Sequence, residues 1–263
     1  MQRFKTLIRP VLEFIFSRVP QPVLRKTEDA SQYFQGKGWG AATVDAELKA
    51  IKHFVLRKNL TNVTVIDAGA NVGNWTDSAL RYLPVSRILC FEPSKTAFEN
   101  LTPRFKGNRN VHCINLGLSD QNKDVTLFSD VKGSGFSSVY SRRVEHFGLK
   151  FDSKEDIQLT TLDGWIENQS ERIEPSILKL DVEGHELAVL VGAIDTLKHL
   201  QIIQFEFGGG NIDSKTYFQD FWYFFAAHNF DIYRVTPRGT VKITEYSEML
   251  EVFRTTNYVA VRR

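Results

Sequence analysis

Short apolar runs alternate with amphipathic helical stripes along most of the chain. The run from Val63 to Ile66 is β-branched and uninterrupted, which is typical of a parallel strand covered on both faces. A helical stripe follows from about Asn74, and Pro84 ends that helix. Further apolar runs of strand length lie at residues 88–91, 111–116, 177–180 and 202–207. The pattern therefore predicts an α/β fold, with a mostly parallel sheet and helices on both faces.

This rhythm of strand and helix changes in two places. Within residues 122–162, the segments 124–128 and 156–160 alternate polar and apolar positions, which predicts a β-hairpin insertion after the third strand. Near the end of the chain, the apolar runs at 231–235 and 258–261 have no long helix between them. We therefore expect an antiparallel strand that closes the sheet.

The first 42 residues differ from the rest and are expected to form an amphipathic arm or flap. An apolar stripe with basic neighbours runs through residues 4–16, and the charged residues and proline that interrupt it argue against a signal peptide. Prolines and glycines between residues 20 and 40 indicate a linker or a flap over the site. We expect residues 3–18 to pack on the body of the protein or on a second subunit of a homo-oligomer. A helix lying on an anionic membrane surface is the alternative.

The turn from Asp67 to Gly73 connects the first strand to its helix and has the character of a ligand-binding turn. Gly69 and Gly73 allow a tight turn and a close approach of the backbone to a ligand. The following helix offers free N–H groups and the positive end of its dipole. In a dinucleotide-binding turn a glycine would replace Asn71, and Asp67 would repel a pyrophosphate. S-adenosylmethionine, which carries a sulfonium and no phosphate, suits this turn better. A purely connecting turn is the alternative.

Acidic residues follow each of the first five predicted strands. Because the carboxyl ends of parallel strands meet at one crevice, these carboxylates are expected there together. They are Asp67, Glu92, Asp120, Asp181 with Glu183, and Glu206. Their mutual repulsion calls for a cationic ligand or a metal ion. Glu92 stands where an acidic residue commonly binds ribose hydroxyls. Asp120 could accept a hydrogen bond from an adenine amine, or belong to a plain surface turn.

Groups that could remove a proton from an acceptor hydroxyl follow the fourth and fifth strands. A positioned base contributes about 10²–10⁴-fold to a rate, and the candidates are Asp181, Glu183, His185 and Glu206. At the start of a helix, His185 would be kept neutral by the positive dipole, which suits a base. A helix-cap histidine without a catalytic role is the alternative. Asp181 and Glu206 could instead hold a divalent metal ion that acidifies a sugar diol.

These motifs together resemble the FkbM family of S-adenosylmethionine-dependent methyltransferases. The resemblance covers roughly residues 43–262 and is carried, in order, by VIDAGANVGNW, FEPSKTAFENL, INLGLSD, SGFSSV, ILKLDVEGHELAVLVGA, IQFEFGGGNID and TNYVAV. It implies a Rossmann-like class I methyltransferase domain over residues 43–263, with a mostly parallel seven-stranded sheet. It also implies transfer of a methyl group from S-adenosylmethionine to a sugar hydroxyl in a glycan or glycosylated metabolite. A peptide or lipid-linked acceptor, and a module that binds the cofactor without turnover, are the alternatives.

The resemblance also implies roles for individual residues. Asp67, Gly69, Asn71, Glu92 and Asp120 are implied as cofactor contacts, and the predicted cofactor site further includes Ala70, Gly73, Trp75, Ser119 and Asp181. Asp181, Glu183 and Glu206 are implied on the acceptor side.

Composition and charge narrow the partners and the compartment. The formal net charge is +2 and no dense run of Lys and Arg appears, so nucleic acid is not expected as a partner. Cys90 and Cys113 lie in adjacent predicted strands and are expected to be buried free thiols, which indicates a reducing cytoplasm. The inner membrane surface is the alternative location, through the arm. No apolar run reaches the length of a transmembrane helix.

Overall fold

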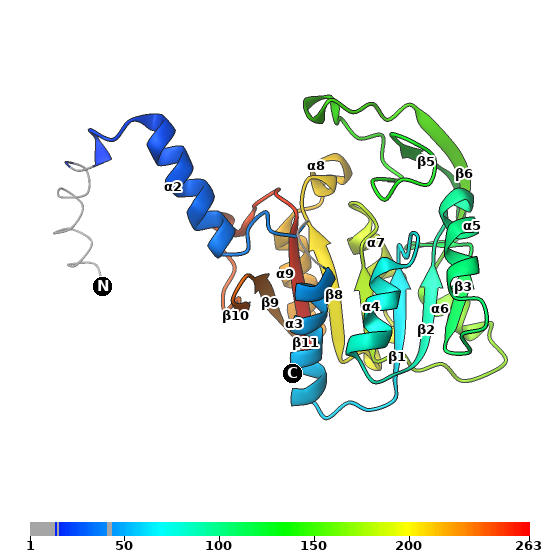
Figure 1. Cartoon of the computed structure of the whole chain (residues 1–263). Coiled ribbons are helices and arrows are strands. Elements are labelled where there is room, and N and C mark those ends of the chain that lie inside the picture. Colours follow the sequence, from blue (N-terminus) through cyan, green and yellow to red (C-terminus); the bar gives the residue numbers. More distant parts are fainter. Residues whose placement is uncertain (1–13, 15, 41–43) are drawn as a thin grey trace.

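A computed structural model describes residues 14, 16–40 and 44–263, and an eight-stranded sheet runs through its centre (Figure 1). The strand order is β10-β9-β11-β8-β7-β1-β2-β3. The strands are β1 (Val63–Ala68), β2 (Val85–Phe91), β3 (Val111–Ile114), β7 (Ile177–Leu180), β8 (Ile202–Phe207), β9 (Phe230–Thr236), β10 (Gly239–Lys242) and β11 (Thr256–Arg262). β11 is antiparallel to both of its neighbours, β8 and β9. The α/β fold with a closing antiparallel strand is confirmed.

The predicted number of seven strands was one too few, because β10 extends the edge of the sheet beyond β9. The two strands form an antiparallel hairpin, with Gly239 paired to Thr236 and Lys242 paired to Tyr233. β10 is short and mostly exposed, so it has no apolar alternation that could have revealed it in the sequence.

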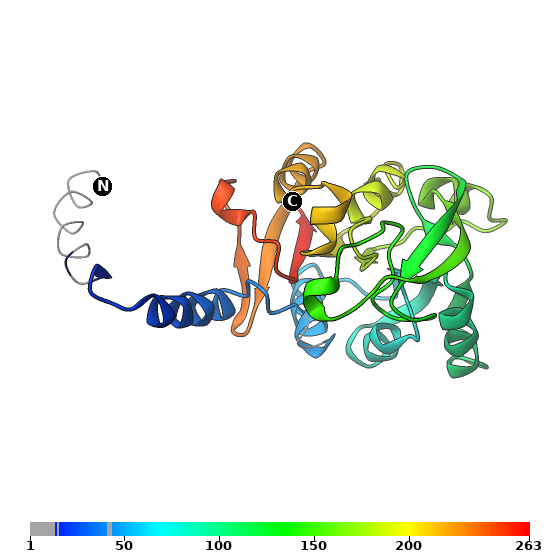
Figure 2. The same ribbon diagram turned by 90° about the horizontal axis from the view of Figure 1, so that it is seen from above.

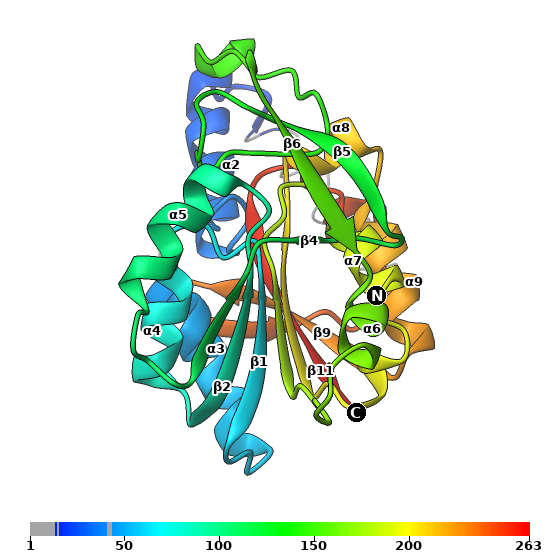
Figure 3. The same cartoon turned by 90° about the vertical axis from the view of Figure 1, so that its right-hand side faces the viewer.

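Helices cover the sheet on both faces (Figure 3). On one face lie α3 (Val44–Arg57), α4 (Asn74–Tyr82) and α5 (Lys95–Arg104); on the other lie α6 (Leu162–Glu167), α7 (Glu186–Val191) and α9 (Phe218–Ala227). Alternate strand residues point to opposite faces of the sheet. Val65 and Ile177 therefore pack in the core beneath α3, α4 and α5, whereas Ile66 and Leu178 pack in the core beneath α6, α7 and α9. This is why the central strands appear as uninterrupted apolar runs.

The predicted insertion forms a second, smaller sheet in the order β4-β6-β5. Its strands are β4 (Gly117–Leu118), β5 (Lys123–Ser129) and β6 (Ser153–Thr160), and β5 and β6 make the expected antiparallel hairpin. The long connection between them contains the 3-10 helix η1 (Glu145–Phe147). The insertion lies above the carboxyl ends of the central strands (Figures 2 and 3). It is therefore placed to cover whatever binds there.

A helix, α2 (Gln21–Phe34), occupies part of the arm where a linker or flap was expected. Pro22 lies in its first turn, where the missing N–H has no partner to lose. No side chain of α2 is buried, and the helix projects from the body of the protein (Figure 1). Most of the predicted amphipathic stripe at residues 4–16 lies outside the described residues. Among the helices of the described ranges, none has the length and apolar character needed to cross a membrane.

The remaining short elements connect the larger ones. They are α8 (Gly210–Ser214) and the 3-10 helices η2 (Thr196–Lys198) and η3 (Glu248–Leu250). Cys90 and Cys113 are paired in register in β2 and β3 and are both free thiols, the first buried and the second half-buried.

Candidate active site

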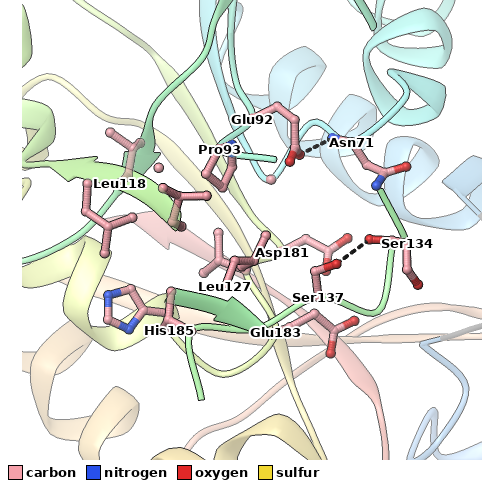
Figure 4. A pocket seen from close by; sticks show the side chains of 17 residues that line it. Asn71, Glu92, Pro93, Leu118, Leu127, Ser134, Ser137, Asp181, Glu183 and His185 are labelled. Carbon is pink, nitrogen blue, oxygen red and sulfur yellow. Dashed lines mark hydrogen bonds between the residues drawn. The ribbon is translucent and has the colours of Figure 1, made fainter. Parts of the chain in front are cut away.

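Two adjoining cavities lie at the carboxyl ends of the central strands. The first, of about 580 Å³, contains residues of the β1–α4 turn and is called the turn cavity (Figure 4). The second, of about 1000 Å³, is lined by Glu206 and is called the Glu206 cavity. Both are lined by Gly135, Asp181 and Glu183. These three residues therefore form the boundary at which a ligand in one cavity would meet a ligand in the other.

The glycine turn is shaped by close backbone packing. Gly69 has φ +76°, and a Cβ there would lie 1.9 Å from the carbonyl oxygen of Asp181. Gly73 has φ +84°, and a Cβ there would press against Phe105 and Leu101. Only glycine allows this backbone conformation together with these contacts. The turn after β1 is thus held directly against the loop after β7.

Glu92 is a fixed carboxylate in the wall of the turn cavity (Figure 4). Its two oxygens accept hydrogen bonds from the backbone N–H groups of Asn71, at 2.7 Å, and Ser94, at 2.9 Å. Burial raises the pKa of Glu92 to about 7, against the effect of these hydrogen bonds. Each oxygen has a further lone pair that can accept a hydrogen bond. That Glu92 binds ribose hydroxyls stays a prediction.

Lys179 is a buried cation behind the turn cavity. Its Nζ lies 2.9 Å from Asp67 Oδ1, 2.8 Å from the carbonyl oxygen of Gly69, and 3.7 Å from Asp181 Oδ2. Burial alone would lower the pKa of Lys179, but the neighbouring carboxylates raise it above its usual range. Asp67 also accepts a hydrogen bond from the Thr76 hydroxyl at 2.6 Å. Asp67 therefore forms an ion pair with Lys179 and lies behind the wall of the turn cavity.

The loop after β7 brings Asp181 and Glu183 to the boundary between the cavities. Glu186 holds this loop, because its Oε1 accepts the N–H groups of Val182 and Gly184 at 3.1 Å each. The Asp181 side chain is 46% exposed, although Lys179 stands beside it. Burial, with the charge of Asp181 adding to it, raises the pKa of Glu183 to about 8.

Arg142 reaches from the insertion into the site. Its guanidinium lies 2.5 Å from Glu183 Oε2 and 3.5 Å from Asp213 Oδ2, and it covers the ring of Phe136 at 4.2 Å. The Arg142 side chain is only 5% exposed. Arg142 was not predicted from the sequence, because a single arginine in a long connection has no spacing that would reveal its partner.

His185 lies between two hydroxyl groups. Its Nε2 is 2.9 Å from the Ser119 hydroxyl, and its Nδ1 is 2.9 Å from the Tyr140 hydroxyl. Burial lowers the pKa of His185 to about 4, and the charge of Lys123 acts in the same direction. The ring is neutral as expected, but burial is the main cause, not the dipole of the short helix α7. Because both ring nitrogens have partners, His185 is poorly placed to accept a proton from a substrate.

Several predicted cofactor residues do not line the turn cavity. Trp75 is buried, and its indole N–H donates to Gln204 Oε1 at 3.0 Å. Asp120 is exposed and lies 3.2 Å from Lys123 Nζ. Of the predicted cofactor residues, Gly69, Asn71, Glu92 and Asp181 line the cavity, whereas Asp67, Ala70, Gly73, Trp75, Ser119 and Asp120 do not.

The Glu206 cavity is rich in carboxylates. Burial raises the pKa of Glu206 well above its usual range, and the charges of Asp181 and Glu183 add to this effect. One carboxylate oxygen from each of these three residues lies within 4.8 Å of the others, a spacing that a metal ion could bridge. Lys179 and Arg142 already lie beside two of them. Their positive charges oppose the binding of a divalent cation there.

Glu47 is a further carboxylate in this cavity that the sequence analysis did not single out. It comes from α3 and lies on the same side of that helix as the buried Ile51 and Phe54, so it was hidden within an apolar stripe. Gln204 Nε2 donates to Glu47 Oε2 at 2.6 Å, and Asn257 Nδ2 donates to Glu47 Oε1 at 2.9 Å. Burial raises the pKa of Glu47 to about 7, against the effect of the hydrogen bond from Gln204.

The sequence profile described as the methyltransferase FkbM domain matches residues 67–232. The chain belongs to the FkbM methyltransferase family. The matched segment begins at Asp67 in the glycine turn and includes Asp181, Glu183, His185 and Glu206. Glu47 lies outside it. The predicted family is confirmed.

Curated relatives of this FkbM-family chain are methyltransferases of differing source. The methyltransferase sdnD of Sordaria araneosa is 28% identical in an alignment of 171 residues that covers 55% of this chain and 64% of the relative. The hexuronic acid methyltransferase AglP of Haloferax volcanii is 26% identical over 151 residues, which are 57% of each chain. The chain therefore spans about 60% of the length of the curated relatives it matches.

Solved methyltransferase structures are also similar to the FkbM-family chain at low sequence identity. The methyltransferase FkbM of Methylobacillus flagellatus KT has a TM-score of 0.42 and 14% identity, and the match covers 79% of this chain and 47% of that one. The plantazolicin methyltransferase BpumL, solved in complex with SAH, has a TM-score of 0.45 and 12% identity, with 99% and 97% covered.

Proposed function

We propose that the protein transfers a methyl group from S-adenosylmethionine to a hydroxyl group of a sugar in a glycan or glycosylated metabolite. The observation that carries this proposal is the boundary between the two cavities, where Asp181 lines both. A methyl donor in the turn cavity and an acceptor in the Glu206 cavity would meet beside this carboxylate. Methyl transfer requires such an in-line alignment, and orientation of two reactants contributes about 7–11 kcal/mol to lowering a barrier.

The turn cavity fits the parts of S-adenosylmethionine. Glu92 presents fixed acceptor oxygens to ribose hydroxyls, and Asp181 offers a half-exposed carboxylate to the positive charges of the donor. Apolar side chains that could pack against a flat ring line the same cavity: Leu118, Leu127, Val139, Ile157 and Leu159. When bound, this cofactor supplies a methyl group that is already activated by its sulfonium.

The Glu206 cavity suits an acceptor with several hydroxyl groups, because carboxylates accept hydrogen bonds from them. Phe136 adds an aromatic face at the same cavity. A relative that its name describes as a hexuronic acid methyltransferase supports a sugar acceptor. Arg142 is already engaged by Glu183 and Asp213, so the cavity favours the hydroxyls of a neutral sugar over an acidic group.

The first test concerns the donor. Calorimetry on ligand-stripped protein should detect binding of S-adenosylhomocysteine and none of NADH. Asp181→Asn should weaken binding of sinefungin, which carries an amine in place of the methyl-bearing sulfonium, by about tenfold, or 1.4 kcal/mol. Binding of the uncharged thioether in S-adenosylhomocysteine should change much less. An equal effect on both ligands would contradict the placement of Asp181 beside the positive charge.

The second test concerns the acceptor. Protein with labelled S-adenosylmethionine should label a sugar within a panel of methyl glycosides and oligosaccharides, and Asp181→Ala should abolish this labelling. Labelling of peptides or lipid-linked small molecules in place of sugars would replace the sugar acceptor by that class. Donor binding with no labelled product in any class would identify a binding module without turnover.

A further inference from the structure

We propose that Glu47 is the catalytic base that takes the proton from the acceptor hydroxyl. The inference rests on the proposed function, because it assigns a role in the same reaction. Glu47 lies on α3, outside the segment that matches the family, yet it lines the Glu206 cavity together with Asp181 and Glu183. It is therefore on the acceptor side of the boundary.

A chain of buried side chains holds the Glu47 carboxylate in place. The Trp75 indole donates to the amide oxygen of Gln204 at 3.0 Å, which leaves the Gln204 amide nitrogen to donate to Glu47 at 2.6 Å. Asn257 donates to the second carboxylate oxygen at 2.9 Å. Gln204 is 2% exposed and Asn257 is 6% exposed, so neither amide can turn freely. Each carboxylate oxygen thus has one fixed donor and a lone pair left for a proton.

The other acid–base groups at the site are less suited to this task. Arg142 binds Glu183, and Lys179 stands beside Asp181. Both nitrogens of His185 are engaged by hydroxyl groups. Glu206 has no hydrogen-bond donor among the residues that the structure describes, and burial favours its protonated form. Amide groups donate to both oxygens of Glu47 and favour its ionised, proton-accepting form against the effect of burial.

Proton transfer to Glu47 during methyl transfer conserves atoms and charge. The O–H bond of the acceptor breaks, and its proton goes to a carboxylate oxygen of Glu47. The oxygen lone pair forms the new bond to the methyl carbon, while the electron pair of the carbon–sulfur bond remains on the sulfur. The positive charge lost at sulfur is balanced by the carboxylate charge lost at Glu47. No further reactant is needed.

The surroundings of Glu47 set the pH range in which it can act. Burial raises its pKa to about 7, with Asp181 acting in the same direction and Lys179 in the opposite one. Glu206, Glu183 and Arg142 are the other charged or titratable groups of the cavity. A base needs its ionised form, so kcat should rise with pH through about 7 and then level off.

A first experiment measures the Glu47 charge without any acceptor. The Trp75 indole N–H is linked to Glu47 through Gln204, so its ¹H–¹⁵N NMR signal should titrate with a midpoint of about pH 7. The titration should disappear in Glu47→Gln. A Trp75 signal that stays constant between about pH 5 and about pH 9, or a titration that persists in Glu47→Gln, would overturn the assignment.

A second experiment measures catalysis with the methyl glycoside that the panel identifies. Glu47→Gln should lower kcat by about 100-fold or more and remove the rise of kcat near pH 7. The Kd for S-adenosylhomocysteine should stay within about threefold, which separates this result from a failure of the proposed function. Glu47→Asp keeps a carboxylate and should restore part of the activity and the pH dependence. Asp45→Asn, on the exposed part of the same helix, is the matched control. A loss of kcat below about threefold in Glu47→Gln would refute the role.

Discussion

At the scale of single residues, the ion pair between Lys179 and Asp67 shows how the donor side is built. The Lys179 side chain is 3% exposed and that of Asp67 is 0% exposed, so removing one partner leaves a charge buried without compensation. Lys179→Met should lower the free energy of unfolding by about 3–5 kcal/mol, measured by urea denaturation. The double variant Asp67→Leu/Lys179→Met should recover much of this loss. A loss below about 1 kcal/mol in the single variant would show that the pair is not buried as described.

His185 makes a second prediction at the same scale, on pH. Its pKa is about 4 in the folded protein and about 6.5 in the unfolded chain, so only the unfolded state gains a proton between these values. The stabilisation from a neutral His185 is complete above about pH 6.5 and is lost as the pH falls toward 4, by about 3 kcal/mol. His185→Asn should flatten this part of the stability profile, measured by urea denaturation at each pH. His53→Asn, on the exposed surface, should leave the profile unchanged.

At the scale of elements, Arg142 fastens the insertion to the rest of the site. Its guanidinium joins the 130–152 connection to Glu183 after β7 and to Asp213 in α8, in addition to the hydrogen bond that Ser138 donates to the Glu183 carbonyl at 2.8 Å. Arg142→Gln should loosen this connection, so that chymotrypsin cleaves near Phe136 or Phe147 at a rate about tenfold higher, measured by mass spectrometry. Arg143→Gln removes the neighbouring, exposed arginine and should leave cleavage unchanged. Equal cleavage of the two variants would show that Arg142 does not restrain the loop.

The elements also show what the sequence can and cannot predict. The strands β1, β7 and β8 could be predicted closely, because most of their residues are apolar, nearly all are buried, and Gly or Asp follows at the crevice. The helix α2 was missed, because none of its residues is buried and so no core constrains its pattern. β10 was missed for the same reason. A buried element has a periodic pattern of apolar residues in its sequence, whereas an exposed element has no such pattern from which to predict it.

At the scale of the whole molecule, the convergence of acidic strand ends was predictable, but their individual roles were not. Topology alone brings Asp67, Asp181 and Glu206 to one edge. Which of them faces a ligand depends on contacts between distant segments. Asp67 lies behind the wall of the turn cavity, where it pairs with the buried Lys179. Glu183 pairs with Arg142, which comes from the insertion. Glu47 joins the site because α3 packs beside β8 and β11, where Gln204 and Asn257 meet it. No local pattern encodes such pairings.

The arm allows a last prediction about the whole chain. α2 contacts the body of the protein at the surface, through Arg254, which lies 3.1 Å from Asp29 and donates to Gln32 at 2.8 Å. The side chains of Arg254 and Asp29 are 51% and 67% exposed. Exposed pairs contribute about 0–1 kcal/mol. Deletion of residues 1–34 should therefore change the free energy of unfolding by no more than about 1 kcal/mol and leave the Kd for S-adenosylhomocysteine unchanged.

A longer deletion supplies the contrast, because the segment that follows α2 is bound to the sheet. The N–H of Gly40 donates to the Thr255 carbonyl at 2.8 Å, that of Gly38 donates to the Thr256 hydroxyl at 3.0 Å, and Asn257 donates to the Gly40 carbonyl at 3.2 Å. Asn257 also holds Glu47, so deletion of residues 1–40 should lower both the stability and the methyl-transfer rate. If the shorter deletion is as harmful as the longer one, the arm contributes contacts to the body of the protein. If neither is harmful, the 35–40 segment does not support the Glu206 cavity.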